Sequence, residues 1–423
     1  MSSQVQRNSR KGHRWALAFL AVLFFAGLFV SCRLDAQVQF SSGSTGADGA
    51  LNITAPGVTY LDPKAMMINP KGDNIFNFTT IQINSGSILK ISELKVHGPV
   101  YFLAQGDVQI AGVIDLRGDD SPGPTATAAE QNPVFAGSGG YSGGLGGVHG
   151  DTNHQALPGN GPGGGAAGDV VAGGTSFFAV GGSFTANRFL VPLVGGSGGG
   201  GTNDNQFGAQ GGAGGGALLI ASSTRIVLSG NGSTVNGLVN GVIYANGGSG
   251  GSRGCGGAGG AVRLVTNSLV AGGANGIQVQ ANGGTFCKTA PQPGLARLEA
   301  NGSTFSGLGN NGSGPVVTSL PFALNLPTVP PPVITVTSIN GIPINANPFS
   351  FPDATINSTT PVPVVINATN VPSNATVTLY LLSDTAPNQS IPVTLTGNST
   401  TSTATVPVTF ASGGTRGFVK ATW

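Results

Sequence analysis

The chain has 423 residues, of which 72 are Gly and only 8% are charged, so its composition lies far from that of an average soluble protein. Its mean hydropathy is slightly positive, which excludes a disordered chain solvated by charge, and its glycines follow no Gly-X-Y register, which excludes collagen. The net charge of +2 comes from the N-terminus, because the chain after residue 36 carries 13 basic and 15 acidic residues. That balance offers nothing to attract nucleic acid.

Residues 1–36 are expected to form a signal peptide. Basic residues precede an uninterrupted apolar run from Trp15 to Val30, and Ala36 is a small residue at the expected cleavage site before Gln37. The run is long enough that an uncleaved signal anchor, a transmembrane helix at the N-terminus, is an alternative. Lipidation is a third reading, because the residues that end at Cys32 resemble a bacterial lipobox. The protein is therefore expected to be secreted or on the outer cell surface, with membrane anchoring through the N-terminal helix as the alternative.

A seven-residue phrase then recurs along the chain. It reads GPVYFLA from Gly98, GALLIAS from Gly216, GAVRLVT from Gly260 and GLARLEA from Gly294. Each phrase is a glycine followed by a short strand with alternating apolar residues, and three phrases are followed by a second strand and a polar turn: VIDLRGD, VIYANGG and IQVQANGG. The strands are too short and too closely spaced for two-residue hairpins. The pattern predicts an all-β parallel β-helix (solenoid) over residues 37–326, with glycines at its corners.

A glycine-rich insertion covers residues 120–215, with one apolar island at 176–194. Two structures are compatible with it. Either the insertion is a flap that closes over one face of the solenoid, or its glycines run as extended strands beside the coils. The anchors of such a flap would be its large apolar residues, Phe177, Phe178, Phe184, Phe189 and Leu190.

The composition changes at a proline-rich linker, residues 327–332. Beyond it, six candidate strands within about 90 residues predict an Ig-like β-sandwich at 333–423, without cysteines. The candidate strands are 333–339, 362–369, 376–382, 391–396, 403–410 and 417–423.

On the segments GDNIFNFTTIQI, VYFLAQGDVQIAGVIDLRGD and GGAVRLVTN, the chain resembles secreted Gly-rich right-handed β-helix surface proteins of Gram-negative bacteria. The resemblance covers about residues 45–305, and the tail resembles bacterial Ig-like modules more weakly. It implies a fold and a location at the cell surface, and no chemistry.

Two cysteines remain after cleavage at Ala36. Cys255 and Cys287 lie about one coil apart in turn-like segments, so they are a disulfide candidate in an exported protein. Two free thiols on separate loops are the alternative. Neither cysteine belongs to a CxxC pair, and the sequence indicates no metal site and no cofactor.

The carboxylates near the insertion are the weak candidates for catalysis: Asp115, Asp119, Asp120 and Asp151. β-Helix lyases and hydrolases use such clustered carboxylates, whereas solvated turn residues are the plain alternative. An enzyme would require one of the first three to meet Asp151, Asp169 or Asp204 in a groove.

The sequence favours an exported structural or adhesive protein without catalysis, whose partners are polysaccharide or other cell-surface components. Membrane contact would occur only through an uncleaved or lipidated N-terminal segment. The alternative is a carbohydrate-active β-helix enzyme, a polysaccharide lyase or hydrolase, with a C-terminal binding module. A passive wall or matrix component is a third hypothesis.

Overall fold

The computed structural model describes residues 39–422, except for 123–133, 148–152, 169, 172–174, 177, 204–207, 252–253, 273–277, 286, 288, 306–315, 346–351, 373–374, 384–385 and 411–416. Strands account for 41% of the chain and helix for 1%, so the protein is all-β, as the sequence predicts. Within the described part, the helix is the single turn α2 (Pro63–Met66), which Asp62 caps by accepting a hydrogen bond from the amide of Ala65.

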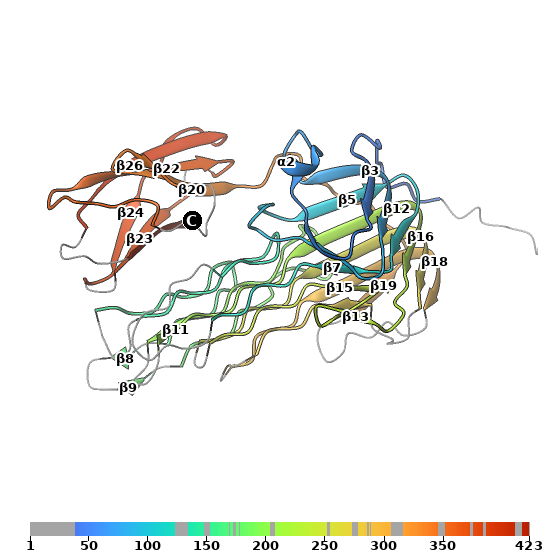
Figure 1. Ribbon diagram of the computed structural model, residues 1–423, viewed down its shortest axis with the longest axis horizontal. Coiled ribbons are helices and arrows are strands. Elements are labelled where there is room, and N and C mark those ends of the chain that lie inside the picture. Colours follow the sequence, from blue (N-terminus) through green and yellow to red (C-terminus); the bar gives the residue numbers. More distant parts are fainter. Residues whose placement is uncertain are drawn as a thin grey trace, which may run out of the picture. The chain divides into compact units, whose positions relative to one another are not determined.

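Eight strands form a large sheet in which every pairing is parallel (Figure 1). Their order is β1-β3-β5-β12-β16-β18-β19, with β6 beside β3 and β12. The four recurring phrases supply β5, β12, β16 and β18, which are neighbours in that order. The strands are β1 (Gly49–Ile53), β3 (Ile75–Ile83), β5 (Val100–Ala104), β6 (Val108–Ile110), β12 (Ala217–Leu228), β16 (Ala261–Ala271), β18 (Leu295–Phe305) and β19 (Val316–Ser319).

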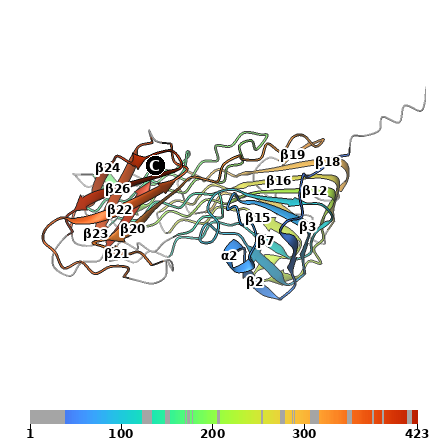
Figure 2. The same cartoon turned by 90° about the horizontal axis from the view of Figure 1, so that it is seen from above.

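The second parallel sheet has the order β17-β15-β7-β4-β2. Figure 2 shows β7 and β15 as a layer separate from β3, β12 and β16. The second strands of the phrases supply β7, β15 and β17. The bounds are β2 (Gly57–Tyr60), β4 (Ser87–Lys90), β7 (Val113–Asp115), β15 (Val242–Tyr244) and β17 (Val279–Gln280).

The main core lies between these two sheets, and alternation along each strand decides which side chains enter it. The phrase residues expected to share one face do so: Val100, Leu218, Val262 and Ala296 lie opposite one another across the large sheet and are fully buried. At one end of this core the rings of Phe76, Phe78 and Phe102 pack together, with centroids 5.4–6.0 Å apart. Each aromatic pair contributes about 0.5–1.5 kcal/mol beyond its buried area.

The outer face of the eight-stranded sheet is also covered. A second apolar cluster contains Leu219 and Val265 of the sheet, Leu190 and Leu193 of the insertion, and parts of the segment 317–326. The apolar island at 176–194 therefore does cover a sheet face, through Leu190 and Phe184, as the flap reading expected. Two of the other expected anchors are largely exposed: 55% of Phe178 and 50% of Phe189 are accessible to solvent. Phe177 lies outside the described residues.

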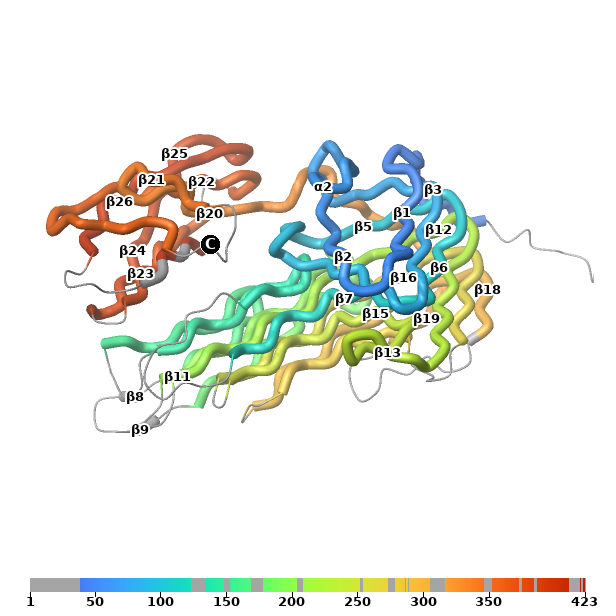
Figure 3. Tube along the Cα trace, viewed as in Figure 1, coloured from blue at the N-terminus to red at the C-terminus, as the bar shows by residue number. Residues whose placement is uncertain are grey.

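Most glycines of the insertion lie elsewhere, in extended segments that hydrogen-bond to one another and run side by side (Figure 3). We call these segments the glycine bundle: 137–147, 157–168, 178–183, 195–201, 209–216, 245–251 and 254–260. The expectation that glycines occupy the corners of the coils is wrong for these residues. The other reading of the insertion, extended glycine segments, describes them correctly.

The hydrogen bonds of the bundle repeat every three residues. In the segment 209–216, amides three residues apart donate to the same neighbouring segment, and successive amides donate to three different neighbours. Gly211 donates to Gly144 and Gly214 to Tyr141, both in one neighbouring segment. Gly212 donates to Cys255 and Gly215 to Ala258, in a second segment. Ala213 donates to Asp119 and Gly216 to Leu116, in a third. Three residues per turn without internal hydrogen bonds is the periodicity of a polyproline-II helix.

Close contact between backbones explains why the bundle is made of glycine. A Cβ at Gly214 would lie 1.8 Å from the carbonyl oxygen of Gly196, and a Cβ at Gly211 would lie 2.0 Å from that of Gly199. Neither separation is sterically allowed. The same argument explains the glycines at the axis of collagen, although here each segment has neighbours on several sides.

The C-terminal region contains two antiparallel sheets around a separate apolar core. β20 and β22 have the predicted bounds, and the other four expected strands shift by a few residues. One sheet has the order β21-β20-β22-β26-β25, with β20 (Val333–Ile339), β21 (Ile342–Pro343), β22 (Val362–Thr369), β25 (Thr396–Gly397) and β26 (Thr401–Val408). The other has the order β24-β23-β27, with β23 (Val377–Ser383), β24 (Gln389–Val393) and β27 (Gly417–Thr422).

Three short antiparallel pairs complete the strands. They are β8 (Val170–Val171) with β9 (Thr175–Ser176), β10 (Thr202–Asn203) with β11 (Gly208–Ala209), and β13 (Thr234–Val235) with β14 (Leu238–Val239).

Candidate functional site

A row of polar side chains crosses the outer face of the five-stranded sheet. Lys90 lies opposite Asp115, which lies opposite Tyr244, which in turn lies opposite Gln280. The preceding residue on each of these strands is apolar and points into the main core, so alternation directs the row outward. This row, which we call the polar row, contains the first of the predicted carboxylates.

Asp115 is the most enclosed member of the polar row. The guanidinium of Arg117 donates two hydrogen bonds to its carboxylate, at 2.9 Å from Nε and 3.2 Å from Nη2, and the amide of Arg117 donates a third at 3.0 Å. Lys90 Nζ lies 3.4 Å away. The side chain is only 6% exposed. Burial by itself would raise the pKa of Asp115, but the hydrogen bond from Arg117 and the charges of Lys90 and Arg117 outweigh it, so the pKa is lowered. Asp115 is therefore an ionised carboxylate with both oxygens engaged.

Lys90 Nζ also lies 3.8 Å from the carboxylate of Asp119. Burial raises the pKa of Asp119, and the neighbouring charge of Lys90 offsets part of that effect. Asp120 accepts a hydrogen bond from the amide of Ser249, so it fastens its turn to the segment 245–251 of the glycine bundle. The structure thus places Asp115 and Asp119 around one ammonium group and gives their pKa values opposite shifts.

The remaining predicted acidic residues cannot be compared with these, because Asp151, Asp169 and Asp204 lie outside the described residues. The same holds for the expected signal peptide, residues 1–36, and for the lipidation candidate Cys32. Among the residues that the structure does describe, no group of three His, Cys, Asp or Glu side chains is arranged to hold a metal ion. No helix in this described part is long and apolar enough to cross a membrane.

Cys255 and Cys287 form a disulfide in the structure, with their Cα atoms 4.7 Å apart. Cys255 belongs to the glycine bundle, where its amide donates to the carbonyl of Gly200. The disulfide therefore connects the bundle to the segment that precedes β18.

Sequence reasoning missed a buried charged cluster on the outer face of the large sheet. Arg263 and Arg297 both contact Glu299, at 2.8 Å and 2.7 Å, and all three side chains are nearly or fully buried. The ring of Phe322 lies over both guanidinium groups, 4.1 Å from Arg263 and 4.9 Å from Arg297. Arg263 also donates to carbonyl groups of the segment 322–324. The cluster fastens the segment that leads to the linker, and a signal for it existed, since both arginines occupy the same place in their phrases.

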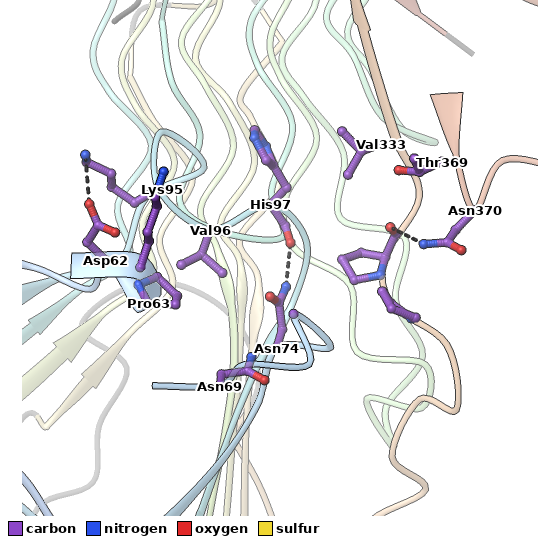
Figure 4. A pocket seen from close by; sticks show the side chains of 14 residues that line it. Asp62, Pro63, Asn69, Asn74, Lys95, Val96, His97, Val333, Thr369 and Asn370 are labelled. Carbon is purple, nitrogen blue, oxygen red and sulfur yellow. Dashed lines mark hydrogen bonds and ion pairs between the residues drawn. The ribbon is translucent and has the colours of Figure 1, made fainter. Parts of the chain in front are cut away.

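A hollow of about 340 Å³ is lined by residues 62–97 and 330–370 (Figure 4). Lys95 and Asp62 pair at 2.9 Å on one wall of the hollow, and Asn74 donates to the carbonyl of His97. Burial lowers the pKa of His97, so its ring is neutral at physiological pH. The hollow therefore has one satisfied ion pair and a neutral imidazole, and the described candidates Asp115, Asp119 and Asp120 do not line it.

Comparisons of the chain with family models, curated proteins and solved structures gave no match.

Proposed function

We propose that this chain is an exported cell-surface or extracellular protein with a structural or adhesive role. In this proposal residues 1–36 are a signal peptide, the two parallel sheets are the faces of a parallel β-helix, and residues 333–423 are an Ig-like β-sandwich. The strand order supports the β-helix, because successive coils each add one strand to the five-stranded sheet and at least one to the eight-stranded sheet. The disulfide between Cys255 and Cys287 suits an oxidising compartment.

One observation carries the adhesive role: the alignment of neighbouring strands in the five-stranded sheet places one polar residue from each strand in the polar row. Equivalent residues of successive coils line up on the outer face, from Lys90 through Asp115 and Tyr244 to Gln280. Neighbouring strands in a sheet lie about 4.7–4.9 Å apart, so the members of the row are regularly spaced. Asp115 and Tyr244 are buried and already hydrogen-bonded, whereas Lys90 and Gln280 at the two ends of the row are partly exposed. A repetitive polymer such as a polysaccharide can contact both accessible ends of the row at once, and weak contacts made together add up by avidity.

The decisive experiment combines location and binding. Cell fractionation with mass spectrometry of the mature N-terminus is expected to find the protein outside the cytoplasm, starting at Gln37. The purified protein is expected to be retained on immobilised cell-surface polysaccharide without releasing sugar fragments. Cytoplasmic protein with an intact N-terminus would contradict the export. Loss of retention in Gln280→Ala but not in Val329→Ala would support the polar row as the surface that binds the polysaccharide. Val329 is exposed and lies far along the chain from the polar row.

The second candidate, a carbohydrate-active enzyme, is favoured by the opposite pKa shifts of Asp115 and Asp119. A lowered and a raised carboxyl pKa side by side is the usual arrangement of a base or nucleophile with a general acid. Against it, both oxygens of Asp115 are engaged by Arg117 and Lys90, which leaves no room for a sugar carbon. Cleavage of a polysaccharide panel by the wild-type protein and Asp120→Asn, but not by Asp119→Asn, would replace the adhesive proposal with the enzymatic one.

A further inference from the structure

The five-stranded sheet ends at β2, and that end is open. β2 pairs with β4 on one side, and no strand of the described residues pairs with its other edge. β1, the corresponding end strand of the large sheet, is interrupted by a register shift between Gly49 and Leu51. Bulges of this kind protect edge strands, and β2 has none.

The backbone hydrogen bonds between β2 and the β4 segment decide which groups of β2 point outward. The amides of Gly57 and Leu61 donate to carbonyls of the β4 segment, so residues 57, 59 and 61 face β4. The N–H and C=O groups of Val58 and Tyr60 therefore point away from the sheet. Their side chains are also accessible, with 49% of Val58 and 42% of Tyr60 exposed.

Charge does not protect this edge. The stretch between Asp48 and Asp62 contains no charged residue, whereas natural edge strands commonly carry Lys or other charges that prevent pairing. Pro56 lies in the turn before β2 and removes no donor from the strand itself. An uncharged edge with exposed Val and Tyr side chains is suited to main-chain pairing with another strand.

We propose that β2 pairs antiparallel with β2 of a second copy of this chain, about a two-fold axis at Thr59. In that register Val58 lies opposite the partner's Tyr60, and both belong to hydrogen-bonded positions of an antiparallel ladder. The same two residues on each copy thus supply four main-chain hydrogen bonds and two cross-strand pairs between a β-branched and an aromatic side chain. This self-complementarity identifies a second copy as the occupant. The proposal does not depend on the adhesive function.

Thr59 provides a test of the register. Residues on the two-fold axis at a non-hydrogen-bonded position have Cα atoms about 4.5 Å apart, which lies within the range that a disulfide spans. The Thr59→Cys protein is expected to form a covalent dimer under mild oxidation, at concentrations where Met67→Cys does not. Met67 is 90% exposed, so its cysteine controls for random cross-linking.

Sedimentation of the full-length exported protein over a range of concentrations tests the association itself. The wild-type protein is expected to dimerise reversibly. Tyr60→Pro removes one outward donor without touching the bonds to β4, and Val58→Lys places like charges at the interface; each should raise the dissociation constant at least tenfold. Met67→Lys should leave it unchanged. Thermal unfolding confirms that the variants are folded.

Three outcomes would overturn the proposal. The first is a wild-type protein that stays monomeric at every concentration. The second is a dimer that both Val58→Lys and Tyr60→Pro leave intact, because its interface would then lie elsewhere. The third is equal cross-linking of Thr59→Cys and Met67→Cys. Pairing of the edge with residues 1–38 of the same chain would produce the first outcome.

Discussion

Arg263 and Arg297 lie directly opposite each other on the neighbouring parallel strands β16 and β18, and Glu299 joins them. Like charges in directly opposite positions destabilise a sheet, so the pair depends on the carboxylate. The amide of Phe322 also donates to Glu299, which ties the segment after β19 to the same group.

Replacement of Glu299 by Gln is therefore expected to lower the free energy of unfolding by about 3–5 kcal/mol, because it leaves two buried cations without a counter-charge. Chemical denaturation measures this loss. Asp107→Asn is the control, since it breaks an ion pair with Arg225 whose side chains are 33% and 50% exposed, and it should cost less than about 1 kcal/mol. Similar losses in both variants would show that the buried ion pairs contribute little.

The glycine bundle is expected to reject even one methyl group. Gly214→Ala places a Cβ within 1.8 Å of a backbone oxygen that cannot rotate away, so we expect a destabilisation of about 1–3 kcal/mol or more. Gly302→Ala is the matched control, because its nearest neighbouring atom would lie 3.9 Å from the new Cβ. The control should change stability by less than about 1 kcal/mol in either direction. Equal melting temperatures for the two variants would contradict the packing described for the bundle.

The disulfide is expected to stabilise the protein by about 3–4 kcal/mol, the amount that loop closure gives for a sequence separation of 32 residues. Thermal unfolding of the wild-type protein should shift to lower temperature under a reducing agent. The double variant Cys255→Ala, Cys287→Ala should already melt at that lower temperature and should show no further shift. A wild-type melting curve that is insensitive to reduction would count against the stabilising role.

Asp115 and Asp119 should affect stability with opposite signs. The folded pKa of Asp115 lies below its ordinary value of 3.8, so its contribution is fully present above pH 3.8 and is lost as the pH falls further. Asp115→Asn should therefore destabilise the protein at pH 7, and the difference from wild type should shrink below pH 3.8. The folded pKa of Asp119 lies above 3.8, so its ionisation at neutral pH opposes folding.

Asp119→Asn should consequently be neutral or stabilising at pH 7. Denaturation of both variants at pH 7 and at pH 3 measures the two effects. A destabilised Asp119→Asn at pH 7 would show that its contact with Lys90 outweighs the cost of burial.

The parallel sheets could be predicted because their side chains carry a pattern. Val100, Leu218, Val262 and Ala296 occupy one place in the recurring phrase, and the structure puts them in one row. The polar row had a similar signal, since Asp115, Tyr244 and Gln280 hold the same place in the second strands. The glycine bundle could not be predicted in the same way, because glycine has no side chain to show which face of a segment is buried. Its order lies in hydrogen bonds between distant segments, which the sequence does not encode locally.

The three-residue repeat in the bundle has a consequence for how its length can change. Deleting one residue from 209–216 would turn each later amide by about a third of a turn and direct it to the wrong neighbour. Deleting three would return every amide to its original direction and shorten the segment by one turn. Insertions and deletions that these segments tolerate should therefore come in multiples of three amino acids, because only these keep each amide directed at its own neighbour.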